Sequence, residues 1–397
     1  MSKLVWLFVA VESIVVLGFL LFGLNILWSV VEGGGGVLGL GLFLGTSLTF
    51  RAVSSIFRGY IVDAFPKKAV IIVSLVSCGV LSFAWLGAER LWVIGVLAYI
   101  AVIVVQDVYS NSYAALVAEK LSPSDYVKYD SIGIMASRVI SVAGNLVSAV
   151  LIIVLPGVSI IVAVACVFAL GAVACYKFLP AVDVKTGSED FKPAAAWAFA
   201  KENVFGDKKI LVFIGIVFLL NIDYAFIPTM LPLYIIAATE LASPLLFGVI
   251  RAANNIGEFL GSGVVLRLSR WVSRLTKIGL SGSALSFVLL PLVYTTPVAV
   301  VVIFAVYSFF DTLTQPFYSY FVSSLASEKR GRILGIVDCV ILLASPLGII
   351  IGSLLSMHGI YAISIGTTAV FLISLLVLVR SKIYNTVVLQ DHAANFL

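Results

Sequence analysis

Six carboxylate side chains lie inside long apolar stretches of this chain, and three arginines lie in the same stretches. A charged side chain at the centre of a lipid bilayer costs about 2.5–3.5 kcal/mol on insertion scales. A chain that keeps several such charges either moves something polar or ionic across the membrane or pairs opposite charges to hold its helices together. The acids are Glu12, Asp107, Asp223, Glu258, Asp311 and Asp338, and the arginines are Arg51, Arg138 and Arg251.

The composition predicts a protein that crosses the membrane many times. Of the 397 residues, 61% are hydrophobic and 11% are charged, and the mean hydropathy is +1.16. The formal charge of +5 comes from basic residues in short loops, so we expect no nucleic-acid partner. The four cysteines and two histidines lack metal-ligand spacing, and no nucleophile–base pair or phosphate loop is present. We therefore expect no metal, no cofactor and no enzymatic activity.

Twelve apolar segments are long enough to span a bilayer as helices. They cover residues 4–31, 37–61, 69–88, 91–118, 128–154, 157–179, 210–237, 244–266, 276–294, 297–324, 333–356 and 360–380. Basic loop residues gather on one side, and Arg90 is the only one on the other, so both termini are predicted to be cytoplasmic. The predicted fold is an all-α membrane protein with two six-helix halves, 1–179 and 210–383. A linker, 180–209, joins them as an amphipathic helix or a solvated segment, and 384–397 forms a cytoplasmic tail.

The two halves repeat each other at one offset of 204 residues. Asp107 corresponds to Asp311, and Asn111 corresponds to Gln315. Parallel repeats of this kind occur in secondary transporters, which bind substrate near the membrane midplane between the halves. Small residues four apart, such as Gly257 with Gly261, predict close helix packing, and we expect helices 2, 5, 8 and 11 to make the closest contacts.

The loop after the second segment carries a partial signature. The pattern G-x-x-x-D-[RK]-x-G-[RK]-[RK] is matched at Gly59, Asp63, Lys67 and Lys68, whereas its first basic position and its second glycine are replaced. With this loop, the helix count and the repeat, the chain resembles the major facilitator superfamily. The resemblance implies alternating access by rocking of two halves, a gating role for this loop, and a cavity lined by helices 1, 4, 7 and 10. The Gly-Pro pair of that family's helix-5 antiporter signature is absent here, because the matching stretch ends in Gly144-Asn145.

Four acids fall on the helices that would line the cavity, and amides lie one helical turn from two of them. A carboxyl group in a low-dielectric cavity favours its neutral form, so it can take a proton from one side and release it on the other. Recognition of a cationic substrate or a metal ion, and a structural role, remain alternatives. The predicted coupling and substrate residues are Glu12, Asp107, Asn111, Asp223, Asp311 and Gln315.

The remaining intramembrane charges are interpreted as pairing groups. These residues are Arg51, Arg138, Arg251, Glu258 and Asp338. Arg138 and Glu258 lie at equal depth on helices 5 and 8, which predicts an ion pair between the halves; pairing of Arg138 with Asp107 is the alternative.

The residues and the resemblance together predict a monomeric secondary active transporter in the plasma membrane. We expect it to couple protons, or another ion, to the export of small amphiphilic or cationic compounds. Proton-coupled uptake of a sugar or organic acid, or transport of a divalent metal ion, is the alternative. A channel is disfavoured, because the chain is asymmetric and has no ring of like residues.

Overall fold

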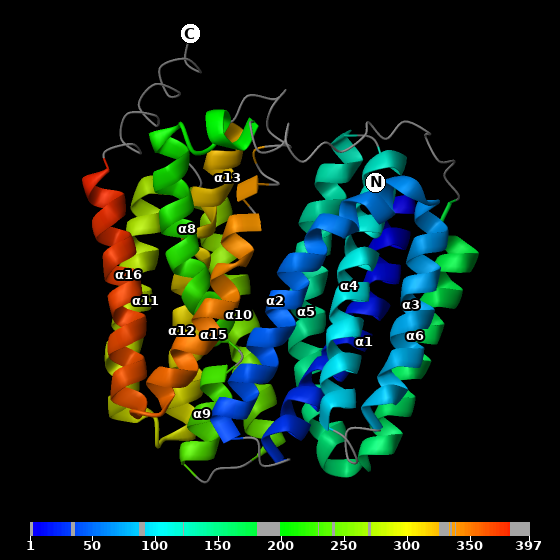
Figure 1. The fold of residues 1–397 in the computed structure, drawn as a ribbon, viewed down its shortest axis with the longest axis horizontal. Helices are drawn as coiled ribbons and strands as arrows, with labels where there is room; N and C mark the ends of the chain where they lie inside the picture. Colours follow the sequence, from blue (N-terminus) through cyan, green and yellow to red (C-terminus); the bar gives the residue numbers. More distant parts are fainter. Residues whose placement is uncertain are drawn as a thin grey trace. The chain divides into compact units, whose positions relative to one another are not determined.

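A computed structural model describes residues 3–32, 36–86, 92–121, 123–180, 199–228, 230–239, 243–268, 271–324, 333, 336–337 and 339–381. This part of the chain is helical and contains no strand (Figure 1). In the first half the helices are α1 (Lys3–Glu32), α2 (Gly36–Ala64), α3 (Lys67–Ala84), α4 (Trp92–Lys120), α5 (Pro123–Val154) and α6 (Gly157–Phe178). In the second half they are α8 (Lys208–Phe226), α9 (Met230–Ala238), α10 (Pro244–Leu268), α11 (Val272–Val293), α12 (Pro297–Thr312), α13 (Gln315–Ser324), α15 (Ala344–Ser356) and α16 (Ile360–Arg380).

Three of the twelve predicted segments are interrupted: the eleventh by a turn at Leu343, after which α15 begins, and the seventh and tenth by a division into two helices each. The seventh segment is divided into α8 and α9 around Pro228, and the tenth into α12 and α13 just before Pro316. Proline has no N–H, and its ring clashes with the carbonyl four residues earlier, which for Pro316 is that of Thr312, the last residue of α12. The prediction of continuous helices over 210–237 and 297–324 was therefore wrong.

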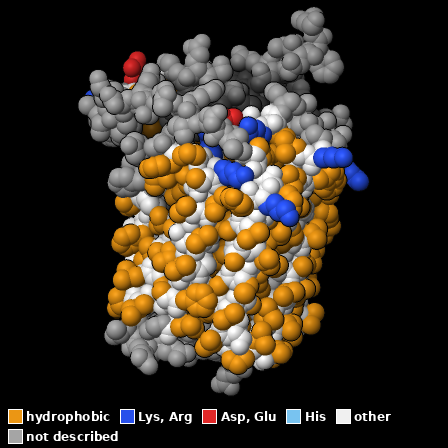
Figure 2. Space-filling model, turned by 90° about the vertical axis from the view of Figure 1, so that its right-hand side faces the viewer, with side chains coloured by type: hydrophobic (Ala, Val, Ile, Leu, Met, Phe, Trp, Pro, Cys, Tyr) orange, Lys and Arg blue, Asp and Glu red, His pale blue; other side chains and the backbone are white. Residues whose placement is uncertain are grey.

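The surface suits a lipid environment. In the described part of the chain, nine helices are long and apolar enough to cross a membrane. Figure 2 shows one face covered by hydrophobic side chains, with lysines and arginines gathered toward one end. Such a surface has the distribution that a bilayer requires.

The chain divides into two compact units. Unit 1 contains residues 1–190 and 243–252, and unit 2 contains 191–242 and 253–397. In unit 1, α1 packs on α5 and α6, and α3 packs on α4 and α6. In unit 2, α8 packs on α15 and α16, and α11 packs on α12 and α16. In the second half, α8, α11, α12, α15 and α16 take the places of α1, α3, α4, α5 and α6. The same four helix pairs therefore pack in both units, which confirms the pseudo-symmetry inferred from the sequence.

Glycines bring helix backbones close together within unit 2. A Cβ on Gly261 would lie 2.7 Å from the carbonyl oxygen of Phe309 in α12, and a Cβ on Gly257 would collide with the carbonyl of Ala305. In α15, a Cβ on Gly348 would collide with the backbone of Ile222 in α8, and one on Gly352 would collide with the ring of Phe226. The predicted close approach is present at these glycines, but their partners are α12 and α8, which belong to the tenth and seventh segments. That helices 2, 5, 8 and 11 make the closest contacts of the whole molecule stays a prediction, since each unit is described by itself.

Candidate functional site

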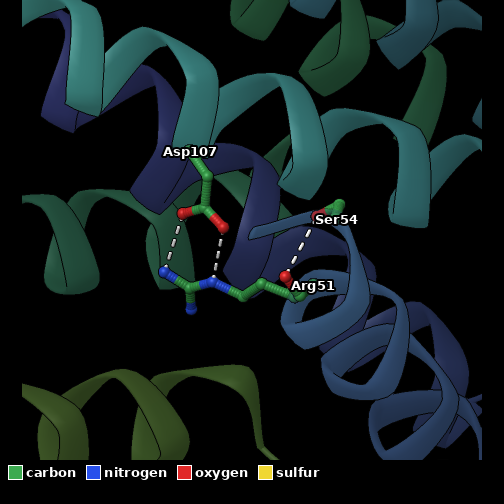
Figure 3. Close-up of polar contacts among 3 residues, drawn as sticks. All are labelled: Arg51, Ser54 and Asp107. Carbon is green, nitrogen blue, oxygen red and sulfur yellow. Dashed lines mark hydrogen bonds and ion pairs between the residues drawn. The ribbon is translucent and has the colours of Figure 1, made fainter. Parts of the chain in front are cut away.

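Asp107 and Arg51 form a two-bond ion pair inside unit 1 (Figure 3). Arg51 of α2 donates from Nε to Oδ2 of Asp107 on α4 and from Nη2 to Oδ1, each over 2.8 Å. Asp107 is 5% exposed, whereas the Arg51 side chain is 41% exposed. A planar guanidinium matches both oxygens of a carboxylate, so this geometry offsets the charge of Asp107 more completely than a single bond would.

Glu12 is held by a tyrosine that the sequence analysis did not single out. The hydroxyl of Tyr129 on α5 donates to Oε2 of Glu12 on α1 over 2.6 Å. Nearby, the Tyr109 and Tyr113 rings stack at 5.6 Å. The Tyr113 hydroxyl donates to the carbonyl of Phe8, and the buried Tyr109 hydroxyl makes no hydrogen bond with the described residues. Glu12 therefore lies in an environment of aromatic rings and hydroxyl groups.

Unit 2 collects three carboxylates from three helices. Asp223 lies in the last turn of α8, Asp311 in the last turn of α12, and Glu258 on α10. Asp311 interacts electrostatically with both other acids, and the hydroxyl of Tyr307 lies in the field of all three. Asp223 is 6% exposed, and its Oδ2 has no hydrogen-bond partner among the described residues. Neither Asp223 nor Asp311 forms an ion pair within the described part of the chain.

An amide on α10 lies close to this cluster in sequence. Asn254 is buried one helical turn before Glu258, and its Oδ1 accepts a hydrogen bond of 2.9 Å from the Ser308 hydroxyl on α12. Its Nδ2 is buried without a partner among the described residues. Asn254 and Ser308 were not predicted; polar side chains on facing apolar helices are the sequence signal that could have indicated them.

The two predicted amides have exposed side chains. Asn111 is exposed on α4, although Asp107 one turn earlier is buried. Gln315 is also exposed, and it does not follow Asp311 on the same helix face, because α12 ends at Thr312. The break overturns the expectation that Asp311 and Gln315 share one helix face.

The basic residues of the predicted gating loop lie at the start of α3 and bind residues near the ends of α4 and α6. Lys67 forms an ion pair of 3.0 Å with Glu119 near the end of α4. The Lys68 amine donates to the carbonyl of Leu179, just after α6, over 2.6 Å. Gly59 and Asp63 lie on α2, but the surroundings of both residues fall outside what the structure describes. Asp338 lies outside the described residues altogether. The gating role stays a prediction.

The other predicted pairing residues are divided between the units. Arg138 and Arg251 belong to unit 1, whereas Glu258 belongs to unit 2. The ion pair between Arg138 and Glu258 stays a prediction, since each unit is described by itself. Among the described residues, no group of three or more His, Cys, Asp or Glu is placed to hold a metal ion.

This architecture of two repeated six-helix units with buried acids is that of a secondary transporter. The chain belongs to the Major Facilitator Superfamily, whose sequence profile matches residues 8–340. It is a multi-pass membrane protein of a transporter family, as the loop signature and the repeat had indicated. No curated protein sequence matches the chain significantly.

Solved structures share the fold. The human organic anion transporter MFSD10 (TETRAN) aligns with a TM-score of 0.71 at 16% identity, over 95% of this chain and 100% of that one. A D-xylose-proton symporter aligns with a TM-score of 0.70 at 14% identity, covering 94% and 97%. The nucleoside transporter NupG aligns with a TM-score of 0.64 at 16% identity, covering 94% and 98%. At these identities the likeness establishes the fold alone.

Proposed function

We propose that this protein is a proton-coupled secondary transporter that exports small amphiphilic or cationic compounds by alternating access. The observation that carries the proposal is the carboxylate cluster of unit 2, in which Asp223, Glu258 and Asp311 interact electrostatically. Three like charges in a low-dielectric interior repel strongly. Uptake of a proton, or contact with a positively charged substrate, relieves that repulsion.

Competition between a proton and a cation for the same carboxylates is a simple basis for exchange. In the outward-open state the acids take up protons, and the substrate leaves. In the inward-open state the protons are released, and the ionised acids attract a cation from the cytoplasm. The proposal places the protein in the plasma membrane, with both termini on the cytoplasmic side.

Nutrient uptake is the second candidate, and the described geometry is compatible with it. Similar folds include a D-xylose-proton symporter and a nucleoside transporter. An organic acid would need a cationic residue at the site, and Arg51, Arg138 and Arg251 are the intramembrane arginines that could supply it. The two candidates differ in the direction in which a proton gradient drives the solute.

Vesicles distinguish these candidates, with ethidium as the probe for lipophilic cations and D-xylose, uridine and benzoate as probes for uptake. In inside-out vesicles with an acidic lumen, we expect ethidium to accumulate and the accumulation to collapse when nigericin dissipates the gradient. Asp223→Asn should abolish accumulation. Asp207→Asn is the matched control, because Asp207 is the exposed cap of the same helix. If ethidium ignores the gradient while one uptake probe enters right-side-out vesicles with it, export is the wrong direction.

A further inference from the structure

We propose that unit 2 carries a binding site for the headgroup of an anionic phospholipid, at the end of the unit where α11 begins and α16 ends. The site consists of Arg274 and Lys277 of α11 and Arg380 of α16, with the indole of Trp271 beside Arg274. Such a site would bind a lipid of the surrounding bilayer rather than the transported solute.

Helix packing brings the basic residues of α11 and α16 to one level. The two helices pack side by side and run in opposite directions (Figure 1). Near their middles, the rings of Phe287 on α11 and Phe371 on α16 stack with their centroids 6.0 Å apart. Arg380 lies nine residues after Phe371, about 14 Å along its helix. Lys277 lies ten residues before Phe287, about 15 Å along the neighbouring helix. The two basic side chains therefore start from the same level.

Arg274 and Trp271 form a stacked pair at this level. The guanidinium carbon of Arg274 lies 4.6 Å from the centre of the Trp271 ring. Both side chains are exposed, Trp271 by 44%. A guanidinium over an indole is held by the ring electrons, and its N–H groups match two oxygens of a phosphate. Tryptophan is enriched where lipid tails meet water, so the pair marks the level of the headgroups.

The positive charge of this surface is not neutralised by the two helices that form it. Neither α11 nor α16 contains an acidic residue. Arg274, Lys277 and Arg380 form no ion pair within the described part of the chain. The described acids Glu202 and Asp207 precede α8, which begins at the same end of unit 2 and opens with two lysines. A surplus of basic side chains at the membrane boundary attracts anionic headgroups.

Apolar side chains next to these charges favour a lipid over a soluble anion. Ile278, beside Lys277 in the sequence, is 51% exposed, and Val379, beside Arg380, is 52% exposed. In a bilayer, acyl chains cover such side chains. A free phosphate would use the charges alone, whereas a phospholipid uses the charged and the apolar surface together.

Native mass spectrometry of the purified full chain in an uncharged detergent tests the site. The probes are phosphatidylglycerol and phosphatidylcholine with the same acyl chains. We expect one phosphatidylglycerol to bind at least about tenfold more tightly than phosphatidylcholine, because each basic side chain near a headgroup contributes about fivefold in affinity. Arg274→Gln and Arg380→Gln should each weaken this binding about fivefold. Arg274→Lys keeps the charge and should lose less.

Lys177→Gln is the matched control, because Lys177 is a basic residue beside the ring of Phe178 at the end of α6, in the other unit. Equal affinity for the two lipids would overturn the proposal. An equal loss in Lys177→Gln would show that total charge, rather than this site, attracts the lipid. Displacement of phosphatidylglycerol by equimolar glycerol phosphate would assign the surface to a soluble anion instead. Thermal unfolding in the same detergent checks that each variant is folded, and the comparison of the two lipids on the wild-type chain decides even if a variant is not.

Discussion

At the scale of single residues, the acids of this transporter differ in what compensates them. Asp107 has a bidentate arginine, and Glu12 has a tyrosine hydroxyl at 2.6 Å. Asp223 and Asp311 have neither an arginine nor a lysine paired with them among the described residues. A charge in an apolar interior without a counter-charge is costly, so we propose the last two as the groups that carry the coupling proton.

Breaking the Arg51–Asp107 pair should destabilise unit 1. Removal of one member of a buried ion pair costs about 3–5 kcal/mol. Since the Arg51 side chain is partly exposed, we expect Arg51→Gln to lie at or below the lower end of that range. Thermal unfolding in detergent measures the loss. Asp107→Asn added to Arg51→Gln should recover stability, and a double variant less stable than the single one would contradict a charge-compensating role.

Removing the Tyr129 hydroxyl should weaken the link between α1 and α5. A hydrogen bond to a charged group contributes about 1.5–3 kcal/mol, so Tyr129→Phe should lower thermal stability by a corresponding amount. Tyr109→Phe is the control, because the Tyr109 hydroxyl has no hydrogen-bond partner among the described residues. Equal losses in the two variants would show that ring packing, rather than the bond to Glu12, sets the stability.

At the scale of elements, the two halves differ in continuity. Glu12 and Asp107 lie on unbroken helices of 30 and 29 residues. Asp223 and Asp311 each lie in the last turn before a break. Interrupted helices in membrane transporters place main-chain polar groups and acids where a cavity can solvate them. The breaks therefore mark unit 2 as the half with the more adaptable polar environment.

The contact between α10 and α12 should tolerate no side chain at Gly257. A Cβ at Gly257 would overlap the main chain of Ala305, so Gly257→Ala should destabilise the protein by about 1–3 kcal/mol or more. Gly263 lies on the same helix with no atom within 4 Å of a built Cβ. Gly263→Ala should therefore be neutral or stabilising by up to about 1 kcal/mol, the helix-propensity difference. Unfolding midpoints of both variants in one detergent give the comparison, and similar values would contradict the packing described here.

The fold was predictable because hydropathy and charge patterning dominate a membrane protein. The partner of each acid could not be predicted from the sequence. Arg51 meets Asp107 through the packing of α2 on α4, which residue spacing alone does not encode. Pro228 and Pro316 were visible signals for the helix breaks, yet they sit within apolar runs that predict continuous spans. The bond from Tyr129 to Glu12 was not predictable either, because it joins residues of α5 and α1 that are far apart in the sequence.

At the scale of the whole molecule, the repeat explains how two unequal halves arise on one plan. The same helix pairs pack in both units, while the residues at equivalent positions have diverged. Arg51 and Arg138 lie in the first half with Glu12 and Asp107, whereas Arg251 lies on α10 of the second half, the helix that also carries Glu258.

Orientation in the membrane is predicted by the one-sided distribution of basic loop residues. In a variant without the native cysteines, Gly34→Cys should react with an impermeant maleimide from outside the cell. Lys185→Cys should react only in inside-out vesicles. Reaction of both positions from one side would contradict the twelve-span topology with cytoplasmic termini.

The coupling role of the buried acids is tested most directly by asparagine variants in proteoliposomes, since asparagine keeps the shape of aspartate and cannot titrate. Glu12→Gln, Asp107→Asn, Asp223→Asn and Asp311→Asn are compared for ethidium transport with and without a pH gradient. The account predicts that Asp223→Asn and Asp311→Asn lose gradient-driven accumulation by at least about tenfold while keeping downhill equilibration, and that Asp107→Asn stays coupled. Unchanged pH dependence in all four variants would contradict proton coupling by these groups.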